Sequence, residues 1–165
     1  SYATSYIPNH SGGTITRGWD GSTTGDISSL VNSPEGTFFT DSAKIQDFSL
    51  FQLDDGSQNN RITLYPRNNT TQITFILTIG GVQVIRQDPS PSGLDTTQFN
   101  KYAIAWGLND FRVYVNGVNI YSSTSNITFG SGALNDLDIN NGKHKQFLIF
   151  QEALSDADCI SLTTL

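Results

Sequence analysis

The chain has 165 residues and a formal net charge of −6 at pH 7, with 36% hydrophobic and only 15% charged residues. Binding to a phosphate backbone needs concentrated positive charge, and the basic residues here are scattered, so the composition disfavours nucleic acid as a partner. No apolar stretch is long enough to cross a bilayer, which argues against membrane insertion, and the single cysteine, Cys159, excludes an internal disulfide.

The N-terminal 34 residues differ from the rest of the chain, because they contain many turn formers and few apolar runs. This pattern predicts an extended arm packed on the rest of the chain, and the length of residues 1–165 fits one domain. We expect one strand near "TITR" (14–17), and we expect Tyr6, Ile7 and Trp19 to hold the arm in place. The chain begins at Ser1 and contains no methionine, which indicates a processed product or a piece of a longer protein.

From residue 36 onward, runs of alternating apolar and polar residues recur with turn signals between them. This pattern predicts antiparallel strands of a two-sheet sandwich rather than strands alternating with helices. The expected strands lie at 36–41, 47–56, 60–66, 71–81, 82–87, 100–107, 110–123 (a hairpin) and 143–150. Segments 87–95 and 123–142 are rich in turn formers and are expected to be surface loops.

The hairpin at 110–123 has the best-defined local signal. Asn116 and Gly117 stand between two alternating runs, and both tolerate the positive φ angles of a two-residue type I′ turn. The apolar residues Phe111, Val113, Val115, Val118 and Ile120 are expected to face the core. The register then pairs Val115 with Val118, Tyr114 with Asn119, Val113 with Ile120 and Arg112 with Tyr121.

The alternation also predicts a second, polar face of the strands. It sends Ile62 and Leu64 inward and leaves Arg61 and Tyr65 on the opposite face. In the hairpin, Arg112, Tyr114, Asn119 and Tyr121 are expected to point away from the core. Trp106 shares its parity with core candidates and is interpreted as a core residue.

The chain is expected to end in a strand followed by a short helix. Ser155 is a suitable N-cap, and Asp158 three residues later completes a short-armed capping box. Ala157, Ile160 and Leu162 are expected to bury one side of this helix against the sandwich. Cys159 lies within the same apolar pattern and is interpreted as an inert buried thiol.

Several separated segments resemble concanavalin A-like, laminin-G-like jelly-roll domains. The stretch "NKYAIAWGLNDFRVYVNGVNI" is similar to the family's central hairpin, and "KHKQFLIFQEALSDADCISL" resembles its last strand and closing helix. The opening "ATSYIPNHSGGTITRGWD", followed by "EGTFFTD", is similar to a narrower group found at the C-terminal ends of bacteriophage tail and fibre proteins. The resemblance implies an all-β jelly roll of two antiparallel sheets with a short C-terminal helix, located in a virion or secreted.

Domains of this kind serve as sugar-binding, adhesion or structural modules, so the fold alone does not decide the function. Carbohydrate binding needs an aromatic surface for the sugar ring and polar groups for its hydroxyls. An ordinary solvated sheet face, or a contact with other chains of a larger homo-oligomeric assembly, explains the same residues. The candidate ligand-binding residues are Asn59, Asn60, Arg61, Tyr65, Arg67, Arg112, Tyr114 and Trp19.

Catalysis and metal binding have weaker signals. Glycoside hydrolysis generally needs two suitably spaced carboxylates, and the Glu-x-Asp-x-x-Glu pattern of sandwich-fold glucanases is absent from this sequence. The resemblance allows a structural calcium at the sandwich rim, which takes oxygen ligands. Its candidate ligands are either Asp54, Asp55 and Asp110 or, in "NDLDIN", Asp136 and Asp138, and no other cofactor is expected.

The resemblance, together with these residue types, implies a non-catalytic module that recognises a polysaccharide or glycan on a cell surface or in the environment, as part of a phage tail-fibre-like protein. A structural or oligomerisation domain of a virion protein is the alternative, and a glycan-cleaving enzyme is a second one.

Overall fold

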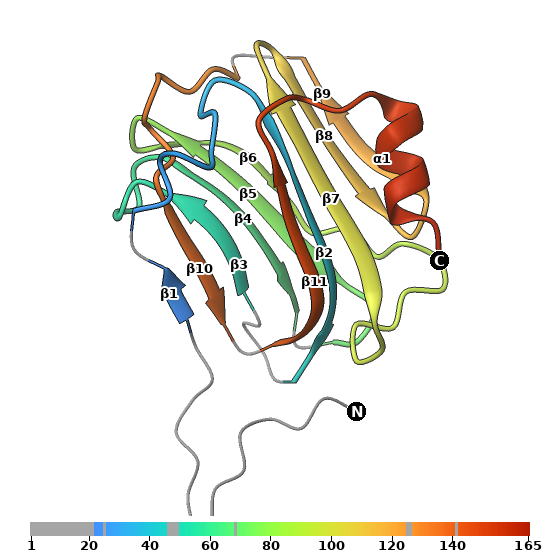
Figure 1. The fold of residues 1–165 in the computed structure, drawn as a ribbon. Coiled ribbons are helices and arrows are strands. Elements are labelled where there is room, and N and C mark those ends of the chain that lie inside the picture. Colours follow the sequence, from blue (N-terminus) through green and yellow to red (C-terminus); the bar gives the residue numbers. More distant parts are fainter. Residues whose placement is uncertain (1–21, 25, 46–49, 68, 125–126, 141) are drawn as a thin grey trace, which may run out of the picture.

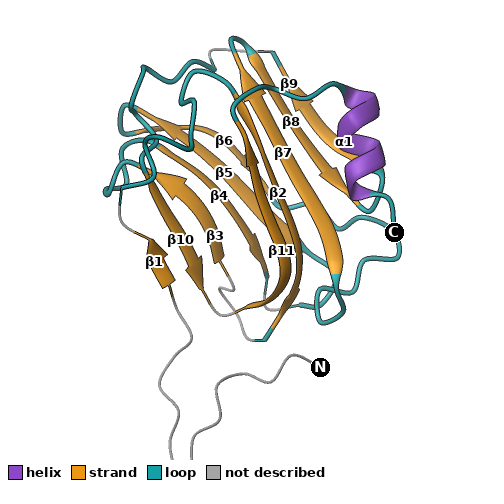
Figure 2. Cartoon of the chain, viewed as in Figure 1, coloured by secondary structure: helices purple, strands orange, loops and turns teal. Residues whose placement is uncertain are grey.

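The computed structural model describes residues 22–24, 26–45, 50–67, 69–124, 127–140 and 142–165. These residues form two β-sheets that face each other, with one short helix outside the second sheet (Figure 1, Figure 2). The expectations for residues 1–21, including a strand at 14–17 and anchoring by Tyr6, Ile7 and Trp19, lie outside the described residues.

Sheet A has six strands and sheet B has five, and all neighbouring strands are antiparallel. The order in sheet A is β1 (Ser22–Thr24), β10 (Asp136–Asn140), β3 (Leu50–Asp54), β4 (Arg61–Pro66), β5 (Ile73–Ile79), β6 (Val82–Gln87). The order in sheet B is β11 (Gly142–Phe150), β2 (Gly36–Lys44), β7 (Asn100–Gly107), β8 (Asp110–Val115), β9 (Val118–Ser123). The predicted fold class, a two-sheet jelly-roll-like sandwich with a short C-terminal helix, is confirmed.

The core lies between the two sheets because successive side chains of a strand point to opposite faces. Phe38 of β2, Phe51 of β3 and Phe147 of β11 form an aromatic cluster across the interior. Trp106 is fully buried, and its indole nitrogen donates to the main-chain oxygen of Ser33 at 2.9 Å. The interpretation of Trp106 as a core residue is therefore confirmed.

The predicted loop at 123–142 is wrong in its second half. Residues 136–140 form β10, which pairs with both β1 and β3. Ile127, Phe129 and Leu134 from the same segment are buried in the core. The many turn formers around these apolar residues conceal a short strand that is stabilised by its neighbours rather than by its own pattern.

The hairpin of β8 and β9 has the predicted turn but only half of the predicted register. Asn116 and Gly117 have φ angles of 49° and 81°, and Val115 pairs with Val118 as expected. A β-bulge then shifts the register, so that Val113 lies opposite Tyr121. The extra residue turns Tyr121 inward, where its ring centroid lies 5.0 Å from that of Phe75. The outward position predicted for Tyr121 is therefore wrong, as is the core position of Val118, which is 59% exposed.

The C-terminal helix α1 (Asp156–Thr163) begins after Ser155, whose hydroxyl accepts from the backbone nitrogen of Asp158 at 3.2 Å. The predicted N-cap is confirmed, but the buried side of the helix differs from the prediction. Cys159 and Thr163 are buried, whereas Ala157 and Ile160 face solvent. Of the expected apolar face only Leu162 packs on the buried cluster. Within the described part of the chain, no helix has the length and apolarity needed to cross a membrane.

Candidate functional site

The outer face of sheet B is covered by α1, which packs on β7, β8 and β9 (Figure 1). A second apolar cluster lies beneath the helix and contains Phe39, Ala103, Ala105, Tyr114 and Cys159. Tyr114 is fully buried there, so its predicted place on an open polar face is wrong. Strand alternation alone predicts that this face points to solvent, but in the tertiary structure the C-terminal helix covers it.

Arg112 contacts the start of the same helix. Its guanidinium group donates to Oδ1 of Asp156 at 2.5 Å and to the main-chain oxygen of Leu154 at 2.9 Å. Tyr114 donates its hydroxyl to the same Asp156 oxygen at 2.6 Å, and burial raises the pKa of this tyrosine to about 12. Hydrogen bonds from Tyr114 and Arg112 lower the pKa of Asp156. In this structure Arg112 and Tyr114 attach a helix and are not on an open surface.

The outer face of sheet A has a different character, since it carries polar side chains from most of its strands. Strand register aligns one row directly across the sheet. Many of these side chains shield one another, and Gln52, Thr63, Thr74 and Thr78 are buried among their neighbours. The row runs Asp138, Gln52, Thr63, Ile76 and Arg86. From β10 to β6 the row therefore runs from an acidic residue to a basic residue, and Asp138 also pairs with Thr23 of the edge strand β1.

A polar groove lies at the β10 and β3 side of this face. It has a volume of about 250 Å³ and is lined by Gln52, Asp54, Gly56, Ser57, Gln58, Asp136 and Asp138. The lining offers amide, hydroxyl and carboxylate groups. Pairing of β10 with β3 sets Asp136 opposite Asp54 and Asp138 opposite Gln52. We refer to this feature as the acidic groove.

The floor of the acidic groove is held by a chain of hydrogen bonds. Thr63 donates to Oε1 of Gln52 at 2.9 Å, and Nε2 of Gln52 donates to Oδ2 of Asp54 at 2.5 Å. The backbone nitrogen of Gly56 donates to the other Asp54 oxygen at 2.6 Å. Burial raises the pKa of Asp54, and the nearby charges of Asp138 and Asp136 raise it further. The hydrogen bonds from Gln52 and Gly56 hold the Asp54 side chain in one orientation.

Three of the sequence-predicted residues lie at the rim of the acidic groove. Arg61 pairs with Asp54 across the strands, and its guanidinium group donates to Gln58 and to Thr78. Asn60 donates to Oδ2 of Asp55 at 2.8 Å and accepts from the backbone nitrogen of Gly80 at 3.0 Å. Asn59 is exposed on the same loop. The structure thus brings Asn59, Asn60 and Arg61 together.

Tyr65 and Arg67 lie toward the other end of β4, in a second polar cluster with Thr74, Arg86 and Asp88. The Arg67 guanidinium carbon lies 5.8 Å from the centroid of the Tyr65 ring. Asp88 lies between the arginines, with Oδ1 3.9 Å from Nε of Arg67 and Oδ2 3.5 Å from Nε of Arg86. A hydrogen bond from Thr74 and the charges of both arginines lower the pKa of Asp88. We call these five residues the Arg67–Arg86 cluster.

The predicted site residues are therefore divided among three places. Asn59, Asn60 and Arg61 border the acidic groove, Tyr65 and Arg67 belong to the Arg67–Arg86 cluster, and Arg112 and Tyr114 lie beneath α1 on the other sheet. Trp19 lies outside the described residues. Sequence reasoning missed Gln52 and Arg86 and did not join Asp54, Asp136 and Asp138. The period-two patterns "LFQLD" and "DLDIN" indicate the outward positions of Gln52 and the three aspartates.

The described part of the chain does not gather the candidate calcium ligands into one group. Among the described residues, no group of three or more His, Cys, Asp or Glu side chains is arranged to hold a metal ion. Asp110, another calcium candidate, lies on sheet B and pairs with Arg112 at 2.9 Å. The candidate calcium ligands are therefore split between the two sheets.

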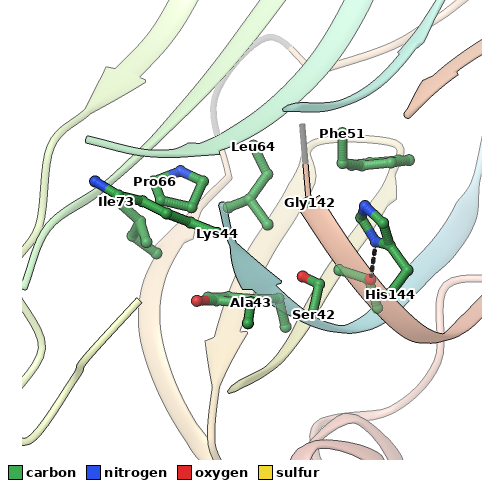
Figure 3. A pocket seen from close by; sticks show the side chains of 11 residues that line it. Ser42, Ala43, Lys44, Phe51, Leu64, Pro66, Ile73, Gly142 and His144 are labelled. Carbon is green, nitrogen blue, oxygen red and sulfur yellow. Dashed lines mark hydrogen bonds between the residues drawn. The ribbon is translucent and has the colours of Figure 1, made fainter. Parts of the chain in front are cut away.

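A separate, mostly apolar pocket lies between the sheets at one end of the sandwich (Figure 3). Its lining includes Phe51, Leu64, Ile73 and Tyr102, and the His144 ring at its side lies 3.4 Å from the Thr40 hydroxyl. The space inside is about 20 Å³. A cavity of that size holds about one water molecule, so it has no room for a sugar ring.

No family model matches the sequence, and no curated protein is significantly similar to it. Solved structures, in contrast, match the fold. The CBM40 of the Ruminococcus gnavus IT-sialidase, bound to α2,3-sialyllactose, has a TM-score of 0.68 at 14% identity, covering 89% of this chain and 93% of that one. Domain 4 of AbnA, a GH43 extracellular arabinanase from Geobacillus stearothermophilus in complex with arabinotriose, has a TM-score of 0.67 at 18% identity, with 87% and 72% covered.

The Bacillus licheniformis β-glucanase matches less completely. Its TM-score is 0.55 at 19% identity, with 69% of this chain and 56% of that chain covered. At such low identities these matches concern the fold alone. The chain therefore shares its two-sheet jelly-roll architecture with carbohydrate-binding domains and with a sandwich-fold glucanase.

Proposed function

We propose that this chain is a non-catalytic carbohydrate-binding module, and that a polysaccharide or glycan binds along the outer face of sheet A. The observation that carries the proposal is the acidic groove, where Gln52, Gln58, Asp136 and Asp138 line one hollow. Amide and carboxylate oxygens accept hydrogen bonds from sugar hydroxyls, and amide nitrogens donate to them. The strands of sheet A hold Gln52, Asp136 and Asp138 in place before any ligand arrives, which lowers the entropy lost on binding.

The fold comparisons support the same class of function. The CBM40 is bound to sialyllactose and the arabinanase domain is in complex with arabinotriose. The arabinanase is described as extracellular, which favours a secreted location for this chain as well. Placement on a phage tail or fibre is the more specific version of the proposal. It rests on the sequence motifs at the two ends of the chain.

The geometry favours binding over hydrolysis. Asp54 is 3% exposed, and each of its oxygens already accepts a hydrogen bond, one from Gln52 and one from Gly56. A general acid must reach the glycosidic oxygen, but the Asp54 carboxyl group is held by hydrogen bonds in the floor of the acidic groove. Both glutamates described by the structure, Glu35 and Glu152, lie on segments beside sheet B and not in the acidic groove.

A glycan array followed by calorimetry tests the proposal. We expect binding to at least one polysaccharide, and we expect it to fall at least tenfold in Asp138→Ala and in Gln58→Ala, because each loses a hydrogen-bonding group that lines the groove. Asp41→Ala on β2 of sheet B is the matched control and keeps full affinity. Binding that is unchanged in both groove variants, or a complete absence of binding on a broad array, contradicts the proposal.

One observation favours the alternative of an assembly domain. An apolar hollow of about 580 Å³ lies between the edges of the two sheets and is lined by Ile27, Leu30, Leu137, Phe147, Ile149 and Gln151. Leu30 is 59% exposed there, so a second copy of the chain finds apolar surface to bury. Light scattering and the glycan array together separate the alternatives. An oligomer that dissociates in Leu30→Asp and binds no glycan supports the assembly domain. A monomer that binds a glycan supports the carbohydrate-binding module.

A further inference from the structure

The Arg67–Arg86 cluster carries more positive than negative charge. Its arginines share one carboxylate, Asp88, and Nζ of Lys44 donates to the main-chain oxygen of Arg67 at 2.5 Å. Two cationic side chains therefore share one acidic side chain within this cluster, and the ammonium group of Lys44 lies beside its backbone. The local excess contrasts with the net charge of −6 for the whole chain.

The ion pairs inside the cluster are loose, and solvent reaches them. The distances from Asp88 to Arg67 and Arg86, 3.9 and 3.5 Å, are longer than the 2.7–2.9 Å typical of charge-assisted hydrogen bonds. The side chains of Arg67, Arg86 and Asp88 are 36%, 41% and 37% exposed. An arginine has five N–H donors. Among the described residues, Arg86 donates only from Nε, so its terminal nitrogens are available to a ligand.

We propose that the Arg67–Arg86 cluster binds the carboxylate of an acidic sugar unit, such as a uronic or sialic acid, within the glycan that the outer face of sheet A recognises. The inference rests on the proposed function and names its ligand class. A carboxylate placed beside both guanidinium groups gains charge-assisted hydrogen bonds of the kind that arginine forms well. Tyr65, whose ring lies against Arg67, supplies aromatic surface for the sugar ring.

The opposite charges on the two sides of the outer face of sheet A favour one orientation of the ligand. Arg86 and Asp138 lie on one cross-strand row, separated by β3, β4 and β5. At about 4.8 Å per strand spacing, the two residues lie roughly 19 Å apart. The carboxylates Asp54, Asp136 and Asp138 repel an acidic unit from the groove. An oligosaccharide that crosses the strands therefore places its acidic unit at Arg86 and neutral units in the groove.

Calorimetry with matched acidic and neutral saccharides tests the inference. One arm compares an oligosaccharide that carries a single uronic acid unit with its methyl ester, and the other compares sialyllactose with lactose, so that the source of the carboxylate is identified. We expect the acidic member of at least one pair to bind at least tenfold more tightly at low salt. We expect this preference to shrink as the salt concentration rises, because the contacts are exposed to solvent.

Variants of the Arg67–Arg86 cluster are expected to change the affinity for the acidic saccharide in opposite directions. Arg86→Gln and Arg67→Gln each remove the preference for the acidic member while binding of the neutral member remains. Asp88→Asn removes the competing carboxylate and strengthens binding of the acidic member several-fold. Lys143→Gln on β11 of sheet B loses the same charge as the arginine variants and leaves the preference unchanged. Circular dichroism spectra of all variants establish that each one is folded.

The outcomes distinguish this inference from the proposed function. Equal affinity for acidic and neutral members, or a preference that survives both arginine variants, overturns the inference and leaves the carbohydrate-binding proposal intact. A lack of binding to these saccharides and to every member of a broad glycan array overturns both. Tighter binding of an acidic member in Asp88→Asn, together with its loss in Arg86→Gln, supports the inference.

Discussion

The guanidinium group of Arg112 on β8 donates to the carboxylate of Asp156, the first residue of α1, at 2.5 Å. A second donor of Arg112 bonds the main-chain oxygen of Leu154, just before the helix begins. The first strand of the hairpin thereby holds the start of the closing helix. The helix has only eight residues, so its stability depends on this contact and on docking rather than on intrinsic propensity.

Arg112→Gln is expected to lower the free energy of unfolding by about 2 kcal/mol, because hydrogen bonds to charged groups contribute roughly 1.5–3 kcal/mol each and a shorter side chain keeps only part of the network. Urea unfolding followed by fluorescence measures the loss. Arg86→Gln on exposed β6 provides the matched control, with an expected change within about 0.5 kcal/mol. Equal midpoints for the two variants contradict a role of Arg112 in holding the helix.

Cys159 is expected to react slowly with a thiol reagent in the folded protein. The side chain is fully buried, and burial raises its pKa to about 11. The thiolate is the reactive form, and at pH 8 its fraction is roughly 200-fold smaller than for a free cysteine of pKa about 8.5. Ellman's reagent measures the rate, with protein in guanidinium chloride as the reference. Arg112→Gln should accelerate the reaction, since it loosens the helix that covers the thiol, and a native rate equal to the denatured one contradicts the burial.

Gly36→Ala is expected to lower the free energy of unfolding by about 1–3 kcal/mol, the usual cost of overpacking a core. A methyl group at this position would lie 2.4 Å from Cζ2 and 2.6 Å from Cη2 of Trp106, which is itself fully buried and cannot move aside. Gly130→Ala is the control, because its methyl group meets nothing within 4 Å. Thermal unfolding compares the variants, and the explanation fails if both shift the melting temperature equally.

Asp54 is expected to make the protein less stable as pH rises. Burial raises its pKa, so the folded state binds the proton more tightly than the unfolded state, whose pKa is near 3.8. The free energy of unfolding therefore falls as pH increases from below 3.8 through the pKa of the folded state. Asp54→Asn carries no charge and should lose this part of the slope. Urea unfolding between pH 3 and pH 7 measures both proteins, and parallel curves contradict the prediction.

Local patterns predicted most of the fold, because strand alternation and turn chemistry act over a few residues. They placed Ile62, Leu64 and Trp106 in the core and found the turn at Asn116. They missed the bulge that turns Tyr121 inward, since one extra residue in a strand reverses every later side chain. They also missed β10, whose pairing partners lie far away in the chain.

The candidate site was harder to predict than the fold. Alternation identifies outward residues but does not say to which sheet a strand belongs, so Tyr65 and Tyr114 look equivalent in the sequence. Strand order separates them, and α1 then covers Tyr114. The same non-local pairing brings Asp138 beside Gln52 and creates the groove. Chemistry that depends on which strands are neighbours is not visible in a local pattern.

The placement of α1 on the outside of sheet B has a practical consequence for binding measurements. Leu165 follows this helix, so the C terminus lies on the side of the sandwich away from the outer face of sheet A (Figure 1). A sensor surface coupled through a C-terminal tag therefore leaves the groove and the arginines directed toward the solution. Random coupling through lysines does not orient the protein in this way, and coupling at Lys44 would attach the surface beside the Arg67–Arg86 cluster, because Nζ of Lys44 donates to the main-chain oxygen of Arg67.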